Sequence, residues 1–174
     1  MDEVVTCLEM TAPNQLIPAR DPPAPLDMEE VGAEAGPLLR STYVRIWEEL
    51  ASGGRMDWSE AQWEDELSRP AVRAWVARVD GEPAGFVELE AERTGEVGIV
   101  VFGLVPELIG KGFGGALLTW ATETAWNLAS QSGGSTTRVC VRTSSDDHPH
   151  ALPNYERRGF RIVLVERRPR ARMR

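Results

Sequence analysis

The pattern of apolar residues is strongest in the middle of the chain. Val97–Leu104 is an almost unbroken apolar run rich in valine, which predicts a buried strand. Pro106 ends this strand, because proline has no N–H group to donate to a sheet ladder. Beyond a glycine-rich segment, apolar residues recur at helical spacing and predict a helix over residues 111–130. Its apolar face would carry Phe113, Leu117, Leu118, Ala121, Ala125 and Leu128.

Shorter stretches on both sides of this unit predict further elements. Five more strands are expected at Val4–Met10, Ala71–Val79, Ala84–Ala91, Thr136–Thr143 and Phe160–Glu166. Three more helices are expected at Gly36–Leu50, Trp58–Leu67 and His148–Arg158, the last with Asp147 as its N-cap. The proline-rich segment Pro13–Pro25 is expected to be an extended connection. The order β-α-α-β-β-β-α-β-α-β predicts one α/β domain with a mixed, mostly antiparallel sheet and flanking helices.

Length and composition are those of one globular domain. The chain has 174 residues, of which 42% are hydrophobic and 26% charged, enough to build a core. We assign residues 1–170 to this domain and residues 171–174 to a basic tail. No apolar run approaches the ~18 residues that span a bilayer, and the acidic N-terminus lacks the basic flank of a signal peptide. Cys7 and Cys140 make no disulfide framework. These features predict a cytoplasmic protein that does not contact membranes.

Charge is distributed unevenly along the sequence. Residues 1–100 hold 21 acidic and 8 basic residues, a balance of −13, whereas residues 101–174 hold 6 acidic and 11 basic residues, a balance of +5. The basic half contains the glycine-rich segment, as a polyanionic ligand would require. Nucleic-acid binding is disfavoured, because the basic residues do not alternate with aromatic ones and the pI is about 4.9.

The glycine-rich segment itself predicts a site for a phosphate group. Gly110-Lys111-Gly112-Phe113-Gly114-Gly115 opens the predicted helix, so its backbone N–H groups can approach an anion at the positive end of the helix dipole. A nucleotide triphosphatase is disfavoured, because Lys111 is not followed by Ser or Thr. A dinucleotide-dependent oxidoreductase is a distant alternative. The glycine spacing fits, but no acidic residue lies between Gln131 and Val141, where the Asp or Glu that binds the ribose is expected.

Two motifs in this order resemble the GNAT superfamily of acetyl-CoA-dependent N-acetyltransferases. The first motif is the predicted strand Val97–Leu104 followed by Pro106-Glu107 and then by the glycine-rich segment. Ile109 departs from this motif, because the family usually has Arg or Gln there. The other is Tyr155 followed by Gly159-Phe160. Phe102-Gly103-Leu104 with Pro106-Glu107, and Asp147-His148-Pro149 with Ala151-Leu152, resemble a bacterial subgroup of unassigned acceptor. The resemblance covers residues 71–165 best and implies a GNAT-like fold.

The resemblance implies a role for each of several residues. Tyr155 would be the general acid that protonates the leaving thiolate, since a phenol pKa near 10 suits that transfer. Residues expected to bind acetyl-CoA (coenzyme A) are Gly103, Leu104, Val105, Gly110, Lys111, Gly112, Phe113, Gly114, Gly115 and His148. Asp146-Asp147-His148-Pro149-His150 is not expected to bind a metal, because the two histidines would not share one helix face.

The proton acceptor for the amine is the least determined part of the site. Glu96 is the first candidate, acting through a water, because it alternates onto the same face of its strand as Gly98. Glu88, on the preceding strand, is the second candidate. A family member can also work without a protein base, by accepting an amine that binds already neutral.

The function implied is the transfer of an acetyl group from acetyl-CoA to a primary amine of a small molecule, by direct attack in a ternary complex. An acyl-CoA-binding sensor or interaction module without turnover is the alternative from another class. The resemblance also makes a homodimer an option, and the acceptor stays unassigned.

Overall fold

The computed structural model describes residues 2–50, 53–91, 93–131 and 134–170. Its seven strands are β1 (Glu3–Met10), β2 (Asp27–Val31), β3 (Val72–Val79), β4 (Glu82–Glu90), β5 (Glu96–Leu104), β6 (Arg138–Ser144) and β7 (Arg161–Arg168). Its four α-helices are α1 (Gly36–Trp47), α2 (Glu60–Leu67), α3 (Gly114–Gln131) and α4 (Ala151–Arg157). The predicted class, one α/β domain with a mixed and mostly antiparallel sheet, is confirmed.

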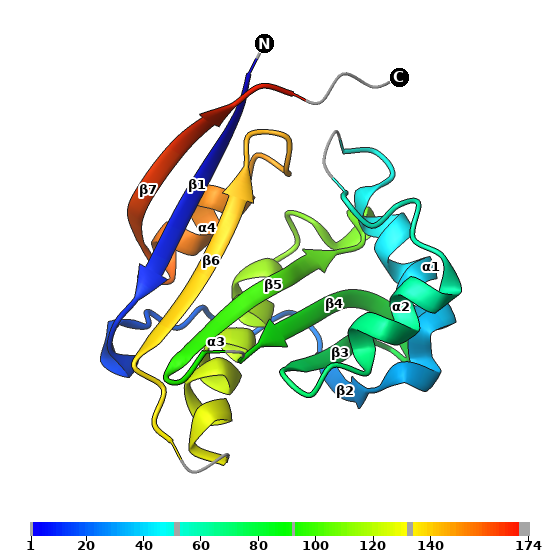
Figure 1. The fold of residues 1–174 in the computed structure, drawn as a ribbon, viewed down its shortest axis with the longest axis horizontal. Helices are drawn as coiled ribbons and strands as arrows, with labels where there is room; N and C mark the ends of the chain where they lie inside the picture. Colours follow the sequence, from blue (N-terminus) through cyan, green and yellow to red (C-terminus); the bar gives the residue numbers. More distant parts are fainter. Residues whose placement is uncertain (1, 51–52, 92, 132–133, 171–174) are drawn as a thin grey trace.

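The seven strands form one sheet in the order β2-β3-β4-β5-β6-β1-β7. Only β5 and β6 run parallel, and every other neighbouring pair is antiparallel. The N-terminal strand β1 lies inside the sheet between β6 and β7, and Figure 1 shows it beside the C-terminal strand. Both ends of the chain are therefore needed to complete the left half of the sheet.

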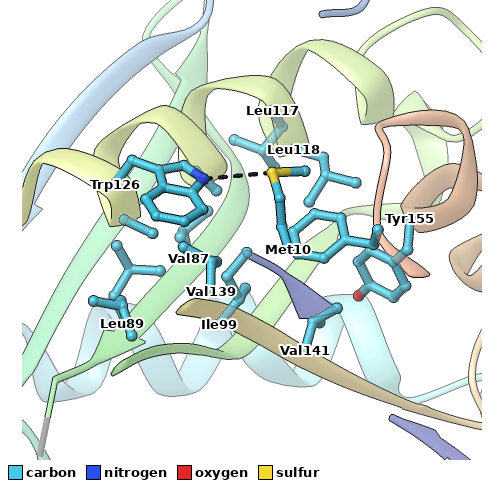
Figure 2. Packing of buried hydrophobic residues seen from close by; sticks show 14 of the residues in the cluster. Met10, Val87, Leu89, Ile99, Leu117, Leu118, Trp126, Val139, Val141 and Tyr155 are labelled. Atoms are coloured by element: carbon cyan, nitrogen blue, oxygen red, sulfur yellow. Dashed lines mark hydrogen bonds between the residues drawn. The ribbon is translucent and has the colours of Figure 1, made fainter. Parts of the chain in front are cut away.

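Two apolar clusters pack on opposite faces of the sheet. One contains the α3 residues Leu117 and Leu118 with Val97 and Ile99 of β5. Figure 2 shows this cluster, in which the Trp126 Nε1–H points at the Met10 sulfur 3.4 Å away. The other cluster lies under α1 and α2, and includes Leu39, Tyr43, Ile46, Trp63, Leu67, Phe86 and Val101. The helices thus divide into one pair per face, which leaves the α1–α2 side of β6, β1 and β7 without a helical cover (Figure 1).

Strand β2 was not predicted, and its composition explains the omission. It reads DMEEV at the edge of the sheet, with mostly exposed residues and no apolar alternation. Its acidic side chains pair with arginines across the ladder: Glu30 contacts the Arg73 Nε at 2.7 Å, and Glu29 contacts the Arg78 Nε at 2.9 Å. An edge strand held by cross-strand charge pairs gives no hydrophobic signal.

Several predicted boundaries need correction. Helix α1 ends at Trp47 rather than Leu50. Helix α3 begins at Gly114, so the glycine turn is not helical. Helix α4 begins at Ala151, and Asp147 does not cap it, because its carboxylate accepts hydrogen bonds from Thr143 and Ser144 instead. The last strand extends to Arg168, and residues 171–174 lie outside the described part of the chain.

None of the helices in the described part of the chain combines the length and the apolar character that crossing a bilayer requires. Cys7 and Cys140 are free thiols, and both are half-buried.

The position of β1 predicts a contrast between two facing residues. Leu8 of β1 is fully buried and lies opposite Ile162 of β7, which is 46% exposed. We expect Leu8→Ala to lower the free energy of unfolding by about 3 kcal/mol, because it leaves a cavity in the core. Ile162→Ala is the matched control and should lose less than about 1 kcal/mol. Urea unfolding followed by circular dichroism measures both, and equal losses would contradict the placement of β1 inside the sheet.

Candidate active site: a cleft where two parallel strands part

The site begins where β5 and β6 separate. These strands pair only from Glu96–Arg138 to Ile99–Val141, although β5 continues to Leu104 and β6 to Ser144. Figure 1 shows the two strands diverging from their paired ends. The other edge of β5 stays paired with β4 as far as Leu104. The edge of β5 that faces β6 therefore has no strand partner beyond Ile99 among the described residues, and its backbone groups can bind a ligand.

A β-bulge at the fork changes which way the β5 side chains point. The register with β4 shifts between Glu88 and Leu89, which pair with Val101 and Ile99, so Val100 is the extra residue. Ile99 packs in the α3 cluster, whereas Val101 packs in the α1–α2 cluster. The bulge thus allows β5 to place side chains in both apolar clusters, in the α3 cluster before the fork and in the α1–α2 cluster after it.

A cleft of about 460 Å³ lies over this fork. One wall comes from α1 and the following loop, including Tyr43, Trp47 and Arg55, and the floor comes from β5 residues up to Leu104. The opposite wall comes from β6, the loop after it and α4, and the upper end from β1 and β7. Of the predicted cofactor and catalytic residues, Gly103, Leu104, His148 and Tyr155 line this cleft.

Gly103 is required by packing rather than by its backbone conformation. A Cβ atom at this position would lie 2.6 Å from the Ile46 Cγ2 and 3.0 Å from the Trp47 ring. Helix α1 therefore rests directly on the floor of the cleft. Val105 lies just beyond the floor, and its N–H donates to the Ala84 carbonyl at 2.9 Å, so this N–H is not available to a ligand.

The predicted phosphate-binding segment forms an exposed turn at the end of the cleft. Ile109 lines the cleft, and Gly110 and Gly112 follow with φ of +77° and +89°, a region that glycine adopts without strain. Among the described residues, no backbone partner engages the N–H groups of Gly110 or Gly112. The first N–H groups of α3, from Gly114 onward, also lack helical acceptors because of their position. These donors fit a diphosphate.

The remaining residues of this segment have different surroundings. Lys111 is exposed, and its N–H donates to the Leu108 carbonyl at 3.3 Å. The Phe113 side chain is buried in the α3 cluster, which leaves only its backbone for a ligand. Gly115 is packed so closely that a Cβ atom would lie 2.6 Å from the Arg158 Nη1 and 2.9 Å from the Ala19 Cβ.

Tyr155 is placed by helix α4 at the inner wall of the cleft. It is only 5% exposed, and its ring lies 6.1 Å from that of Phe102 and 6.2 Å from that of Phe160. Figure 2 shows its hydroxyl on the side of Val141. Burial, and to a lesser extent the charge of Asp147, raise the Tyr155 pKa, because both disfavour a phenolate. The hydroxyl therefore keeps its proton at neutral pH and can act as a donor.

His148 lies in the loop before α4, not in the helix as predicted. Its Nδ1 accepts a hydrogen bond from the His150 N–H at 3.1 Å. Burial and the neighbouring His150 lower the His148 pKa, so the ring is neutral at physiological pH. No group of three or more potential metal ligands occurs among the described residues.

The two predicted bases lie outside the cleft lining. Glu96 is at the start of β5, where its carboxylate contacts the Arg138 Nη1 at 3.1 Å and the Cys140 sulfur at 3.7 Å. Glu88 is fully buried behind the cleft wall, and its Oε2 lies 2.6 Å from the Arg55 Nη2. At this distance the two groups form a close ion pair in the interior of the protein. Burial raises the Glu88 pKa, and the Arg55 charge only partly opposes this effect.

Several cleft residues escaped the sequence analysis. Arg55 follows Gly53-Gly54 in a loop, and a single arginine there carries no recognisable pattern. Glu3 and Val5 reach the cleft only because β1 joins the sheet next to β6, which no local signal indicates. Arg142 could have been found, since alternation places it on the opposite face of its predicted strand from Val139 and Val141.

The split sheet, the glycine turn and the buried tyrosine lie around one cleft or at its end. A family model described as the acetyltransferase (GNAT) family matches residues 39–160. The chain therefore belongs to the GNAT family of acetyltransferases. No curated protein matches the sequence.

Solved structures share the fold. A GCN5-related N-acetyltransferase from Kribbella flavida is 18% identical with a TM-score of 0.62, and the match covers 93% of this chain and 55% of that protein's chain. A GCN5-related N-acetyltransferase from Sphaerobacter thermophilus is 16% identical with a TM-score of 0.61, and the match covers 97% of this chain and 53% of that one. An IAA acetyltransferase from Bacillus cereus is 26% identical with a TM-score of 0.58, and the match covers 80% of this chain and 79% of that one. The chain thus spans little more than half the length of the first two.

The exposed turn predicts a glycine-specific effect on cofactor binding. We expect Gly112→Ala to weaken acetyl-CoA binding about tenfold, because the methyl group strains the backbone and covers the N–H groups that face the anion. Gly81→Ala is the matched control, since Gly81 has φ +81° in the β3–β4 turn with no atom near its Cβ position. Isothermal titration calorimetry measures both, and equal affinities would contradict the assignment of the turn to the phosphates.

The surroundings of Glu88 predict a pH-dependent change in stability. A carboxyl group whose folded-state pKa is raised stabilises the protein fully below the unfolded pKa, near 4.5, and loses this contribution as pH rises through the folded pKa. We therefore expect the unfolding free energy of the native protein to fall, relative to that of Glu88→Gln, as the pH rises above about 4.5. Urea titrations across this range measure the difference. A difference that moves the opposite way would show that Arg55 outweighs the burial.

Proposed function

We propose that the protein transfers an acetyl group from acetyl-CoA to a primary amine of a small molecule, by direct attack of the amine in a ternary complex. The single observation that supports this proposal best is the fork between β5 and β6, which opens a cleft lined by Tyr155 and, next to the glycine turn, by Ile109. Acetyl-CoA, when bound, supplies a thioester whose carbonyl carbon is the electrophile. The family membership adds the reaction class.

The chain's own groups have distinct tasks in this reaction. The N–H groups of Gly110, of Gly112 and of the first residues of α3 bind the diphosphate, with His148 on the wall of the cleft formed by the loop before α4. The free edge of β5 at Gly103 and Leu104 orients the pantetheine arm, as one more strand would be held by a sheet edge. Val105 does not bind the cofactor through its N–H, because this group is already donated to the Ala84 carbonyl of β4. It marks the end of the strand edge along which the cofactor would lie. These contacts bring the thioester near the fork without any movement of the core.

Proton transfer completes the step. As the amine nitrogen bonds to the carbonyl carbon, the carbon–sulfur bond breaks and the Tyr155 hydroxyl gives its proton to the departing sulfur. The amine must lose one proton, which we assign to water in the open cleft. Of the predicted bases, Glu88 is better placed than Glu96, because it lies directly behind the cleft residue Arg55. It can accept the proton only indirectly, because Arg55 lies between its carboxylate and the cleft.

A second candidate function is an acyl-CoA-binding sensor without turnover. It is favoured by Ile109, which lacks the side chain the family usually places beside the phosphates, and by the absence of Glu88 and Glu96 from the described lining of the cleft. Thiol release from acetyl-CoA with a panel of amines separates the two functions. Steady release supports the transferase, whereas tight binding with no release across the panel supports the sensor.

The role of Tyr155 predicts a selective loss of turnover. We expect Tyr155→Phe to lower kcat about 100-fold or more, because the leaving sulfur loses its proton donor. The Kd for acetyl-CoA should stay unchanged, since the ring and its packing against Phe102 and Phe160 remain. Steady-state kinetics with the best amine of the panel, and calorimetry with acetyl-CoA, measure the two quantities. An unchanged kcat would remove Tyr155 from the proton transfer.

A further inference from the structure

Some of the charged side chains that line the cleft already have hydrogen-bond or ion-pair partners, and others do not. Both carboxylates in its lining already accept hydrogen bonds: Glu3 accepts from the Ser144 hydroxyl at 2.6 Å, and Asp147 accepts from the Thr143 hydroxyl at 2.9 Å. Arg168 is paired with Glu166. Arg142, in contrast, is exposed and has no ion pair or hydrogen bond with any residue that the structure describes.

Arg142 occupies a special place in the sheet. It directly follows Val141, the last residue of β6 that pairs with β5. It alternates onto the same face as Cys140, which lies opposite Gly98, and this face has no helical cover over β6. The guanidinium therefore projects from the rim of the fork on the α1–α2 side of the sheet, where a second substrate can enter.

Arg55 on the facing wall is already engaged, unlike Arg142. Its Nη2 lies 2.6 Å from the Glu88 Oε2 and 3.9 Å from the Glu66 Oε2. The guanidinium lies 4.4 Å from the centre of the Trp58 ring, and its Nη1 is buried, so a ligand in the cleft does not reach that nitrogen. Among the described residues that line the cleft, Arg142 is therefore the arginine whose charge is unpaired.

Arg142 is not needed by acetyl-CoA. The phosphates of the cofactor would lie at the glycine turn beyond Ile109, whereas Arg142 faces the cleft near the fork, where the uncharged thioester would lie. Its unpaired positive charge is therefore available to another ligand.

We propose that the acceptor carries a carboxylate beside its amine, as an amino acid does, and that Arg142 binds this carboxylate. This inference rests on the proposed function of the cleft. A planar guanidinium binds a carboxylate through two parallel hydrogen bonds, which would also fix the direction of the amine. Cationic polyamines are disfavoured as acceptors, because they have no carboxylate and their positive charges would be repelled by Arg142.

The test compares amino acids with their amides. A panel of α- and ω-amino acids and the matching carboxamides is assayed for CoA release from acetyl-CoA, with the native protein and with Arg142→Gln. The native protein should prefer the carboxylate of each pair at least tenfold in kcat/KM, although the amides have the less basic amines. In Arg142→Gln the preference should fall to about one through a higher KM, while acetyl-CoA affinity stays unchanged.

A matched variant controls for the loss of an exposed arginine. Arg161→Gln removes an exposed arginine from β7 on the same face of the sheet, outside the cleft lining, and should keep the preference. Native protein that favours the amides or polyamines, or Arg142→Gln that keeps the carboxylate preference, overturns the proposal.

A binding measurement separates this inference from the proposed function. Calorimetry of the same amino acids and amides, added to protein saturated with CoA, needs no turnover. Binding that requires both the carboxylate and Arg142 supports the inference even if no amine is acetylated, in which case the transferase proposal alone fails. Binding that is equal for acids and amides, or absent for both, overturns it.

Discussion

The separation of β5 and β6 after the Ile99–Val141 pair is the constraint on which the site depends. Strands that part lose ladder hydrogen bonds, and each backbone group left unpaired away from water costs roughly 1–3 kcal/mol. The separation persists because each strand is held on its other side. β4 pairs with β5 as far as Leu104, and β1 pairs with β6 as far as Ser144. Because the gap opens into a cleft, water or a ligand can satisfy the exposed groups.

The N-terminal segment supports this arrangement at two levels. Strand β1 fills the place between β6 and β7, and its Leu8 and Met10 are fully buried against the α3 core. The chain that follows crosses the start of α3, where the Ala19 N–H donates to the Thr119 hydroxyl at 2.9 Å. Asn154 of α4 donates to the Gly114 carbonyl at 3.1 Å from the other side. The glycine turn is thus flanked by contacts that fix its base and leave its N–H groups exposed.

Sequence patterns predicted the parts of the fold that have strong periodicity or special backbone chemistry. Strand β5, the glycine turn and α3 were predicted because valine runs, positive-φ glycines and a helical stripe are local signals. Strand β2 could not be predicted, since its stability comes from Arg73 and Arg78 on a strand more than 40 residues away. The same holds for the place of β1 in the sheet, and therefore for Glu3 and Val5 in the cleft. Alternation gives the face of β5 on which Glu96 lies but not its distance along the strand from the cleft, and the described lining of the cleft does not include it.

The bulge at Val100 and the pair of Arg55 with Glu88 belong to one structural solution. After the bulge, Val101 turns toward the α1–α2 core and lies opposite Glu88 in the ladder. A carboxylate buried at this depth requires a counter-charge, and Arg55 from the loop after α1 supplies it at 2.6 Å. Its guanidinium also packs against Trp58, and its Nη1 is buried. Glu88 therefore acts on the cleft through Arg55: it holds this side chain in the wall and balances its charge, so the exposed positive charge near the fork is that of Arg142 on the opposite wall.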